Sequence, residues 1–127
     1  LDFSFSGLKP QALNHLNQER QAGREIRVND VAASFQEAVV EVIADKAVMA
    51  AEKYGQKQIV MAGGVASNTR LRALIEEKAA AKGIAVLKPS PVLCTDNGAM
   101  IASAAYYAYK NGEEPTLELD AVPGLEF

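Results

Sequence analysis

The pattern of apolar and polar positions predicts a chain of helices with short strands between them. The most regular stretch begins after Asn29 or Asp30, either of which can cap a helix, and ends at Gly55. Its apolar positions recur three and four residues apart, as on one face of a helix. We expect that face to consist of Val31, Phe35, Val39, Val42, Ile43, Ala47, Ala50 and Tyr54.

Shorter patterns lie on both sides of this helix. Residues 3–6 read FSFS, whose alternation predicts a short strand ended by Gly7, and a helix is expected over 8–21. Downstream, the β-rich runs 58–62 and 84–87 predict two strands. Between them, residues 68–82 predict a helix that ends at Gly83 and buries Leu71, Leu74, Ile75 and Ala79. A last, alanine-rich helix follows Asp96 and ends at Asn111 and Gly112.

The order of these elements predicts an α/β fold with a parallel pair of strands and a right-handed crossover helix. We expect a single unit over 1–127: a strand with a helix and loop in 1–29, an α-β-α-β-α core in 30–112 and an irregular tail in 113–127. Two strands are few for a parallel sheet, which needs neighbours and cover on both faces. The sequence is therefore expected to be a piece of a longer protein.

Composition narrows the class of protein. The 127 residues are 49% hydrophobic and carry a formal charge of −3, as expected for one soluble, cytoplasmic globular domain. No stretch predicts a membrane span or a signal peptide. The single cysteine, Cys94, excludes an internal disulfide and is expected to be a small buried hydrophobe.

A glycine pair follows the first of the two central strands. In IVMAGGVASNTRL, Gly63 and Gly64 stand between the strand and a helix that begins near Asn68. Glycine lets the backbone approach a ligand closely, and a helix N-terminus favours phosphate. The pair could equally serve only to turn the chain between a strand and a helix. It matches neither a Walker loop nor a dinucleotide fingerprint.

Asp96 follows the second central strand. Because the carboxyl ends of parallel strands meet at one edge of a sheet, its loop and the glycine turn are expected to face the same crevice. A lone aspartate there can hold a hard cation, whereas local chemistry favours an N-cap. His15, the only histidine, is expected to face solvent. No HExxH motif or complete catalytic set is present.

Nucleic-acid binding receives little support from the residues, because the chain is acidic overall. Tyr106, Tyr107 and Tyr109 could stack on bases, but packing against a neighbouring domain is the commoner use of such residues. A solvated helix face accounts more readily for the basic residues, which are Arg70, Arg72, Lys78, Lys82 and Lys88.

Four blocks resemble the TsaD family of tRNA threonylcarbamoyladenosine biosynthesis proteins, formerly labelled glycoproteases or O-sialoglycoprotein endopeptidases. The resemblance covers nearly the whole chain and is to the carboxy-terminal portion of the family. The blocks are DFSFSGLK at 2–9, DVAASFQEAVVEVI at 30–43, MAGGVASNTRLR at 61–72 and LCTDNGAMIA at 93–102.

The resemblance implies part of a ribonuclease-H-like lobe of the actin, hexokinase and Hsp70 fold, with nucleotide and metal held in the cleft between two lobes. It implies that Gly63, Gly64 and Asn68 contact an adenylate or ATP-type nucleotide. It also implies that Asp96 is one ligand of a divalent metal, iron or zinc, whose other ligands come from an HxxxH motif. That motif is not in this chain.

The implied activity of the complete protein is transfer of a threonylcarbamoyl group from threonylcarbamoyl-adenylate to N6 of the adenosine beside the tRNA anticodon. Bacterial members work with two partner proteins, a small paralogue and an ATPase. Two alternatives are a non-catalytic, nucleotide-responsive scaffold and the metallopeptidase of the older label. The 127 residues alone are expected to be inactive and to self-associate through an open strand edge.

Overall fold

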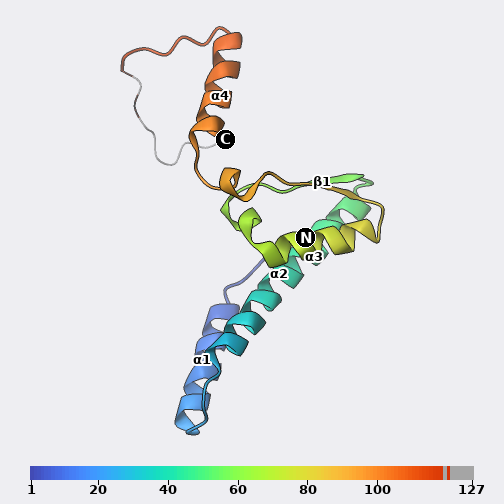
Figure 1. Cartoon of the computed structure of the whole chain (residues 1–127), viewed down its shortest axis with the longest axis vertical. Helices are drawn as coiled ribbons and strands as arrows, with labels where there is room; N and C mark the ends of the chain where they lie inside the picture. Colours follow the sequence, from blue (N-terminus) through green and yellow to red (C-terminus); the bar gives the residue numbers. More distant parts are fainter. Residues whose placement is uncertain (119, 121–127) are drawn as a thin grey trace. The chain divides into compact units, whose positions relative to one another are not determined.

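The computed structural model describes residues 1–118 and 120, and it divides the chain after Thr95 into one unit over Leu1–Thr95 and another over Asp96–Phe127 (Figure 1). Each unit is described by itself. The elements are α1 (Leu8–Gln21), α2 (Val28–Lys53), β1 (Gln58–Val60), the 3-10 helix η1 (Gly64–Ser67), α3 (Thr69–Ala80), β2 (Ala85–Leu87), the 3-10 helix η2 (Pro91–Leu93) and α4 (Gly98–Lys110).

The two strands pair in parallel, as predicted. Gln58 lies opposite Ala85, and Val60 lies opposite Leu87. Helix α3 makes the crossover between them, and Gly83, with φ +66°, ends the turn that follows it. The parallel pairing confirms the α/β class. It also places the carboxyl ends of both strands at the same edge of the sheet.

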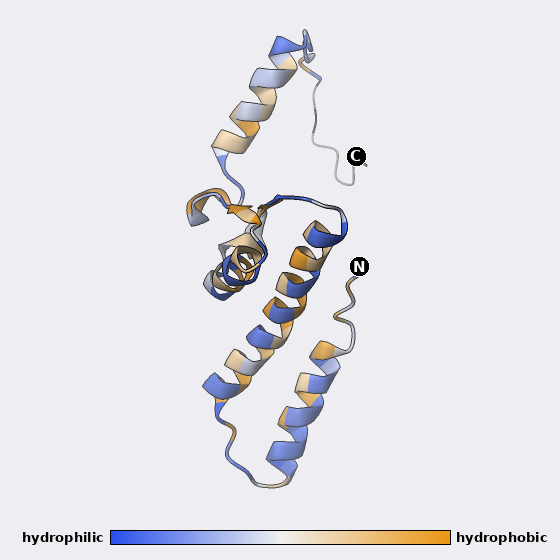
Figure 2. Cartoon of the chain, turned by 90° about the vertical axis from the view of Figure 1, so that its right-hand side faces the viewer, coloured by the Kyte–Doolittle hydropathy of each residue, from blue (hydrophilic) through white to orange (hydrophobic). Residues whose placement is uncertain are grey.

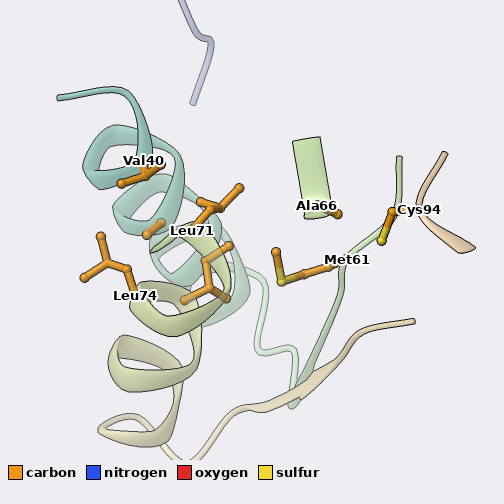
Figure 3. Close-up of a cluster of buried hydrophobic side chains, with 8 residues drawn as sticks. Val40, Met61, Ala66, Leu71, Leu74 and Cys94 are labelled. Atoms are coloured by element: carbon orange, nitrogen blue, oxygen red, sulfur yellow. The ribbon is translucent and has the colours of Figure 1, made fainter. Parts of the chain in front are cut away.

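The core of the first unit lies between α2, α3 and the sheet (Figure 3). All four apolar residues predicted for the face of α3 are buried, and Leu71 and Ile75 are each 3% exposed. Cys94 is buried at 3% exposure, as expected. The two clusters that form this core are Val40, Ala44, Met61, Ala66, Leu71, Leu74, Ile75 and Cys94, and Val48, Ala51, Ala79 and Ile84.

The prediction for the face of α2 was largely wrong. The buried positions are Val40, Ala44, Val48 and Ala51, whereas Phe35, Val42 and Tyr54 are exposed. Of the predicted residues, Ile43 is half-buried and packs against the core. Helix α2 is apolar over more than one stripe, so its periodicity alone does not decide which stripe packs against α3. The helix also begins two or three residues earlier than expected, with Arg27 at the N-cap position.

The segment at residues 3–6 is not a strand, contrary to the prediction. Phe3 and Phe5 stack with ring centroids 6.2 Å apart, and the ammonium of Lys46 lies 4.9 Å from the centre of the Phe3 ring. In the described part of the chain β1 pairs only with β2, so the alternating segment has no strand beside it to complete a ladder.

Helix α1 lies beside the first half of α2 and is mostly hydrophilic (Figure 2). It has no buried residue, and His15 is exposed, as predicted. None of the described helices combines the length and apolar character that crossing a bilayer requires.

Helix α4 makes up the regular part of the second unit, and it too has no buried residue. It ends at Asn111 and Gly112, as predicted, with Gly112 at φ +78°. Residues 113–118 and 120 contain no helix or strand, and the remainder of the predicted irregular tail lies outside the described residues.

Candidate functional site

The turn after β1 has a backbone shape that depends on glycine. Gly63 adopts φ +85°, in the region that residues with a Cβ rarely enter. Its carbonyl accepts the Ala66 N–H at 3.0 Å, and the Ser67 hydroxyl donates to the Gly64 carbonyl at 2.6 Å. A Cβ built on either glycine would meet no protein atom within 4 Å, so both α-carbons face open space. A ligand could approach this backbone closely.

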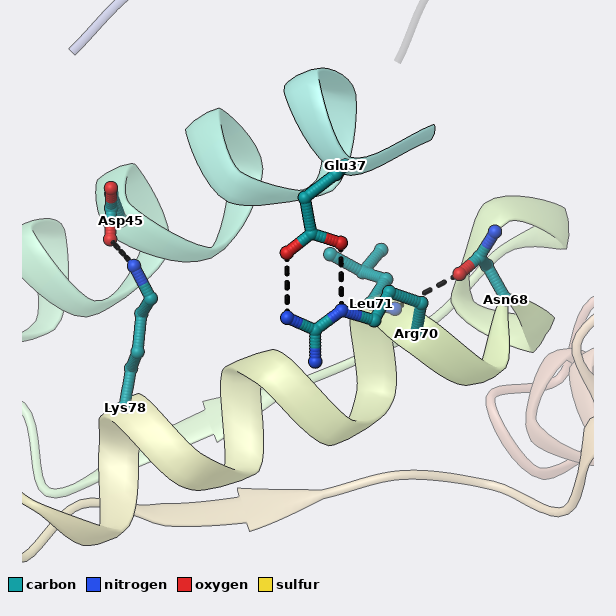
Figure 4. A network of polar contacts seen from close by, with 6 residues as sticks. All are labelled: Glu37, Asp45, Asn68, Arg70, Leu71 and Lys78. Atoms are coloured by element: carbon teal, nitrogen blue, oxygen red, sulfur yellow. Dashed lines mark hydrogen bonds and ion pairs between the residues drawn. The ribbon is translucent and has the colours of Figure 1, made fainter. Parts of the chain in front are cut away.

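Asn68 joins this turn to α3. Its Oδ1 accepts the Leu71 N–H at 2.9 Å, which makes it the N-cap of the helix (Figure 4). Its Nδ2 donates to Gln36 Oε1 at 3.1 Å. The cap fixes the helix N-terminus, whose remaining N–H groups and positive dipole end suit an anion. The structure therefore brings Gly63, Gly64 and Asn68 together in one short segment.

Ion pairs hold α3 against α2. Arg70 donates two hydrogen bonds to Glu37, at 2.8 and 2.6 Å, and these lower the pKa of the Glu37 carboxyl (Figure 4). Lys78 pairs with Asp45 farther along the two helices.

A third pair, Lys82 with Glu52, lies at 2.8 Å. Because residue numbers rise together on both helices, α2 and α3 run in the same direction. The glycine turn thus begins a helix that is braced along its length.

Asp96 is exposed, and the residue after it caps α4. Asn97 Oδ1 accepts the Met100 N–H at 3.1 Å, so the cap that local chemistry assigned to Asp96 belongs to Asn97. Asp96 opens the second unit, whereas Gly63, Gly64 and Asn68 belong to the first. Its carboxylate is not needed to begin the helix.

A model of the family described as tRNA N6-adenosine threonylcarbamoyltransferase, TsaD, matches residues 1–103. The chain belongs to the TsaD family. Three curated relatives carry the name tRNA N6-adenosine threonylcarbamoyltransferase. The protein of Clostridioides difficile is 54% identical over 125 residues, that of Desulfitobacterium hafniense 50% over 125 residues, and that of Bacillus cereus 52% over 126 residues. Each alignment covers 98% of this chain and 37% of the relative, so the chain spans little more than a third of their length.

The TsaD family has the actin, hexokinase and Hsp70 fold, and the parallel strands with their crossover helix are consistent with part of one lobe. The name of the family and of the relatives is that of a transferase. It agrees with the main interpretation of the sequence rather than with a metallopeptidase.

The described residues of this TsaD chain do not form a metal site by themselves. Across the part that the structure describes, no three His, Cys, Asp or Glu side chains gather closely enough to hold an ion. His15 lies on α1, and Asp96 offers one carboxylate. These residues fit a metal only as the source of one ligand.

The basic residues that the sequence placed on a solvated helix face are largely neutralised. Arg70, Lys78 and Lys82 pair with acids of α2, and Lys88 pairs with Glu76 at 2.5 Å. Their side chains are 30–50% exposed, but only Arg70 and Lys78 lie on α3, so the solvated helix face describes those two alone.

The tyrosines of α4 are exposed at 54% for Tyr106, 64% for Tyr107 and 78% for Tyr109. The rings of Tyr106 and Tyr107 meet edge to face at 5.4 Å.

Arg72 differs from the other basic residues, which are exposed and paired with acids, and the sequence analysis missed its role. It is only 9% exposed and donates hydrogen bonds to the Ala66 and Pro89 carbonyls and to Cys94 Sγ. Its position was the available signal: it follows Leu71 directly and precedes Ile75 by three residues, which places it on the flank of the apolar face.

Proposed function

We propose that this chain forms the carboxy-terminal share of an enzyme that transfers a threonylcarbamoyl group from threonylcarbamoyl-adenylate to N6 of the adenosine beside the tRNA anticodon. The observation that carries the proposal is the open glycine turn at Gly63 and Gly64, which leads into Asn68, the N-cap of α3, and lies within the residues that match the family. The names of the relatives support the transfer of a threonylcarbamoyl group to N6 of an adenosine in tRNA.

In this reaction the N6 amine attacks the threonylcarbamoyl carbonyl. A carbon–nitrogen bond forms, the bond from that carbon to the phosphate oxygen breaks, N6 loses a proton and the adenylate leaves. Negative charge therefore grows on the phosphate. Backbone N–H groups at the turn and the N-terminus of α3 are suited to hold that phosphate and stabilise its charge without rearrangement.

Asp96 would give one carboxylate to a divalent metal, iron or zinc, whose other ligands come from outside these residues. Its exposure and its release from capping support this role. A small paralogue and an ATPase are the proposed partner proteins of the complete enzyme.

The test uses a chimera in which these residues replace the matching segment of the Clostridioides difficile relative. The chimera should form threonylcarbamoyladenosine on tRNA, and the 127-residue chain alone should not, because catalysis needs groups held together in one site. A chimera that folds and binds adenylate but never modifies tRNA would favour the scaffold alternative. Activity of the 127-residue chain alone would contradict the proposed division of the site.

Asp96→Ala in the chimera tests the metal role. Bound metal and activity should fall together, while the melting temperature measured without metal stays within about 1 °C of the parent's, since a surface residue outside the cap contributes little stability. Asn97→Ala is the matched control: it removes the cap of α4, which costs about 1 kcal/mol, and should leave the metal content unchanged. Unchanged metal content in Asp96→Ala would contradict the assignment.

A further inference from the structure

Arg72 is the only charged residue that is buried among the residues that the structure describes. A guanidinium keeps its charge at any ordinary pH, and taking it out of water is costly unless its N–H groups find acceptors. Its place in the first turn of α3 puts it directly after the glycine turn. A residue held in this way points to a specific structural task.

The acceptors of Arg72 lie in two separate loops. Nε donates to the Ala66 carbonyl, inside η1 and therefore in the loop that leaves β1. Nη2 donates to the Pro89 carbonyl at 2.8 Å and to Cys94 Sγ at 3.0 Å, on the two sides of η2 in the loop that leaves β2. One side chain thus binds both loops at the carboxyl edge of the sheet.

The strand ladder does not reach this far. Its last bond runs from the Met61 N–H to the Leu87 carbonyl at 2.8 Å, and beyond it the two loops leave the sheet. Arg72 bridges them from the side of α3. The planar guanidinium suits this task because its donors point in fixed, diverging directions, whereas a lysine ammonium is a single point of attachment.

We infer that Arg72 is a positioning residue that sets the spacing between the loop at Gly63–Asn68 and the loop at 88–95. The inference rests on the proposed function, because the first loop carries the proposed phosphate contacts. The second loop runs directly into Asp96. Substitution of Arg72 leaves the Ala66 and Pro89 carbonyls without this donor and lets the two loops move independently.

The test compares Arg72→Met, Arg72→Lys and the parent in the Clostridioides difficile chimera. Amide hydrogen exchange without ligand should become about ten-fold faster in both loops in Arg72→Met, as expected when hydrogen bonds from a charged group are lost. KM for threonylcarbamoyl-adenylate should rise about ten- to a hundred-fold, since small displacements of positioned groups are that costly. The value of kcat should change less, and Arg72→Lys should recover part of the loss.

Two controls separate positioning from general damage. Arg70→Met, two residues away, removes the pairing with Glu37 and should leave the exchange of both loops and KM unchanged. Val48→Ala destabilises the second core cluster, which contains no residue of either loop, and should reduce the amount of active enzyme while KM stays constant.

Faster exchange in one loop only, or in neither, would overturn the inference whether or not the enzyme is active. An Arg72→Met variant with parental KM would also overturn it. If both loops exchange faster in Arg72→Met but the parent chimera does not bind the adenylate, the bridge stands and the proposed function fails.

Discussion

The Asn68 side chain has two roles to test, the capping of α3 and the proposed contact with the nucleotide. Different substitutions separate them. Asn68→Ala removes the Oδ1 that caps α3 through the Leu71 N–H at 2.9 Å. Loss of such a cap costs about 1 kcal/mol, and the exposed hydrogen bond to Gln36 adds a few tenths at most. Since α3 packs into the core, the loss should be felt by the whole first unit.

For a chain of this size, about 1 kcal/mol corresponds to a fall in melting temperature of roughly 3–5 °C. Asn68→Asp keeps a capping oxygen and places a negative charge at the helix N-terminus, where the dipole favours it. That variant should stay within about 0.5 kcal/mol of the parent. Urea unfolding followed by circular dichroism at the helical band measures both variants.

The reasoning is refuted if Asn68→Asp is as unstable as Asn68→Ala, or if Asn68→Ala unfolds at the parental urea concentration. In the complete enzyme the same pair tests ligand contact. If the amide Nδ2 faces the nucleotide, Asn68→Asp should weaken adenylate binding although its stability is retained, because a donor has been replaced by a negatively charged acceptor.

Three further predictions concern stability and association. Leu74→Ala should cost about 2–5 kcal/mol because the side chain is buried, whereas Leu13→Ala on exposed α1 should cost less than about 0.5 kcal/mol; urea midpoints decide this. The hydrogen bonds from Arg70 lower the pKa of Glu37 in the folded state. Its contribution to the free energy of unfolding is therefore fully present above the unfolded pKa of about 4.3 and is lost as the pH falls through the folded pKa. Glu37→Gln should therefore flatten the acid limb of a stability–pH curve, and an unchanged limb would contradict the pairing. Val60 is 69% exposed on β1, whose outer edge is open. The 127-residue chain should therefore self-associate through that edge, and Val60→Lys should reduce the self-association. A stable monomer at high concentration by light scattering would contradict the prediction.

The sequence predicted the elements of the central α-β-α-β-α region because each carries its own start and stop signals. Gly55, Gly83 and Gly112 each follow a helix in the left-handed conformation expected of them. Helix α3 was placed correctly and its buried face was identified, since its apolar residues occupy one narrow stripe. Such information is local.

The errors have a shared origin in contacts beyond the local chain. Helix α2 has apolar residues around much of its circumference, so only the position of α3 decides that Val40 rather than Val42 is buried. The FSFS segment alternates like a strand, but a strand needs a neighbour. Arg72 looked like a surface cation because two of its three acceptors, Pro89 and Cys94, are 17 and 22 residues away in sequence.

The glycine turn of the candidate site was predicted correctly, whereas the local role of Asp96 was not. Gly63, Gly64 and Asn68 are consecutive or nearly so, and a strand-turn-helix pattern brings them together without help from distant residues. Asp96 was given a competing cap role because two adjacent polar residues, Asp96 and Asn97, both precede α4. Only the hydrogen bond from the Met100 N–H shows which of them caps the helix.

The ion pairs between α2 and α3 have an evolutionary consequence. All the acids of these pairs lie on one helix and all the bases on the other. Each pair is exposed and contributes little alone, so natural variation can remove any one of them at small cost. A charge reversal on one helix, however, replaces attraction with repulsion at that position, and selection should favour a matching reversal on the partner helix. Glu37 with Arg70, Asp45 with Lys78 and Glu52 with Lys82 should therefore covary among homologues, while the charge of each single position drifts.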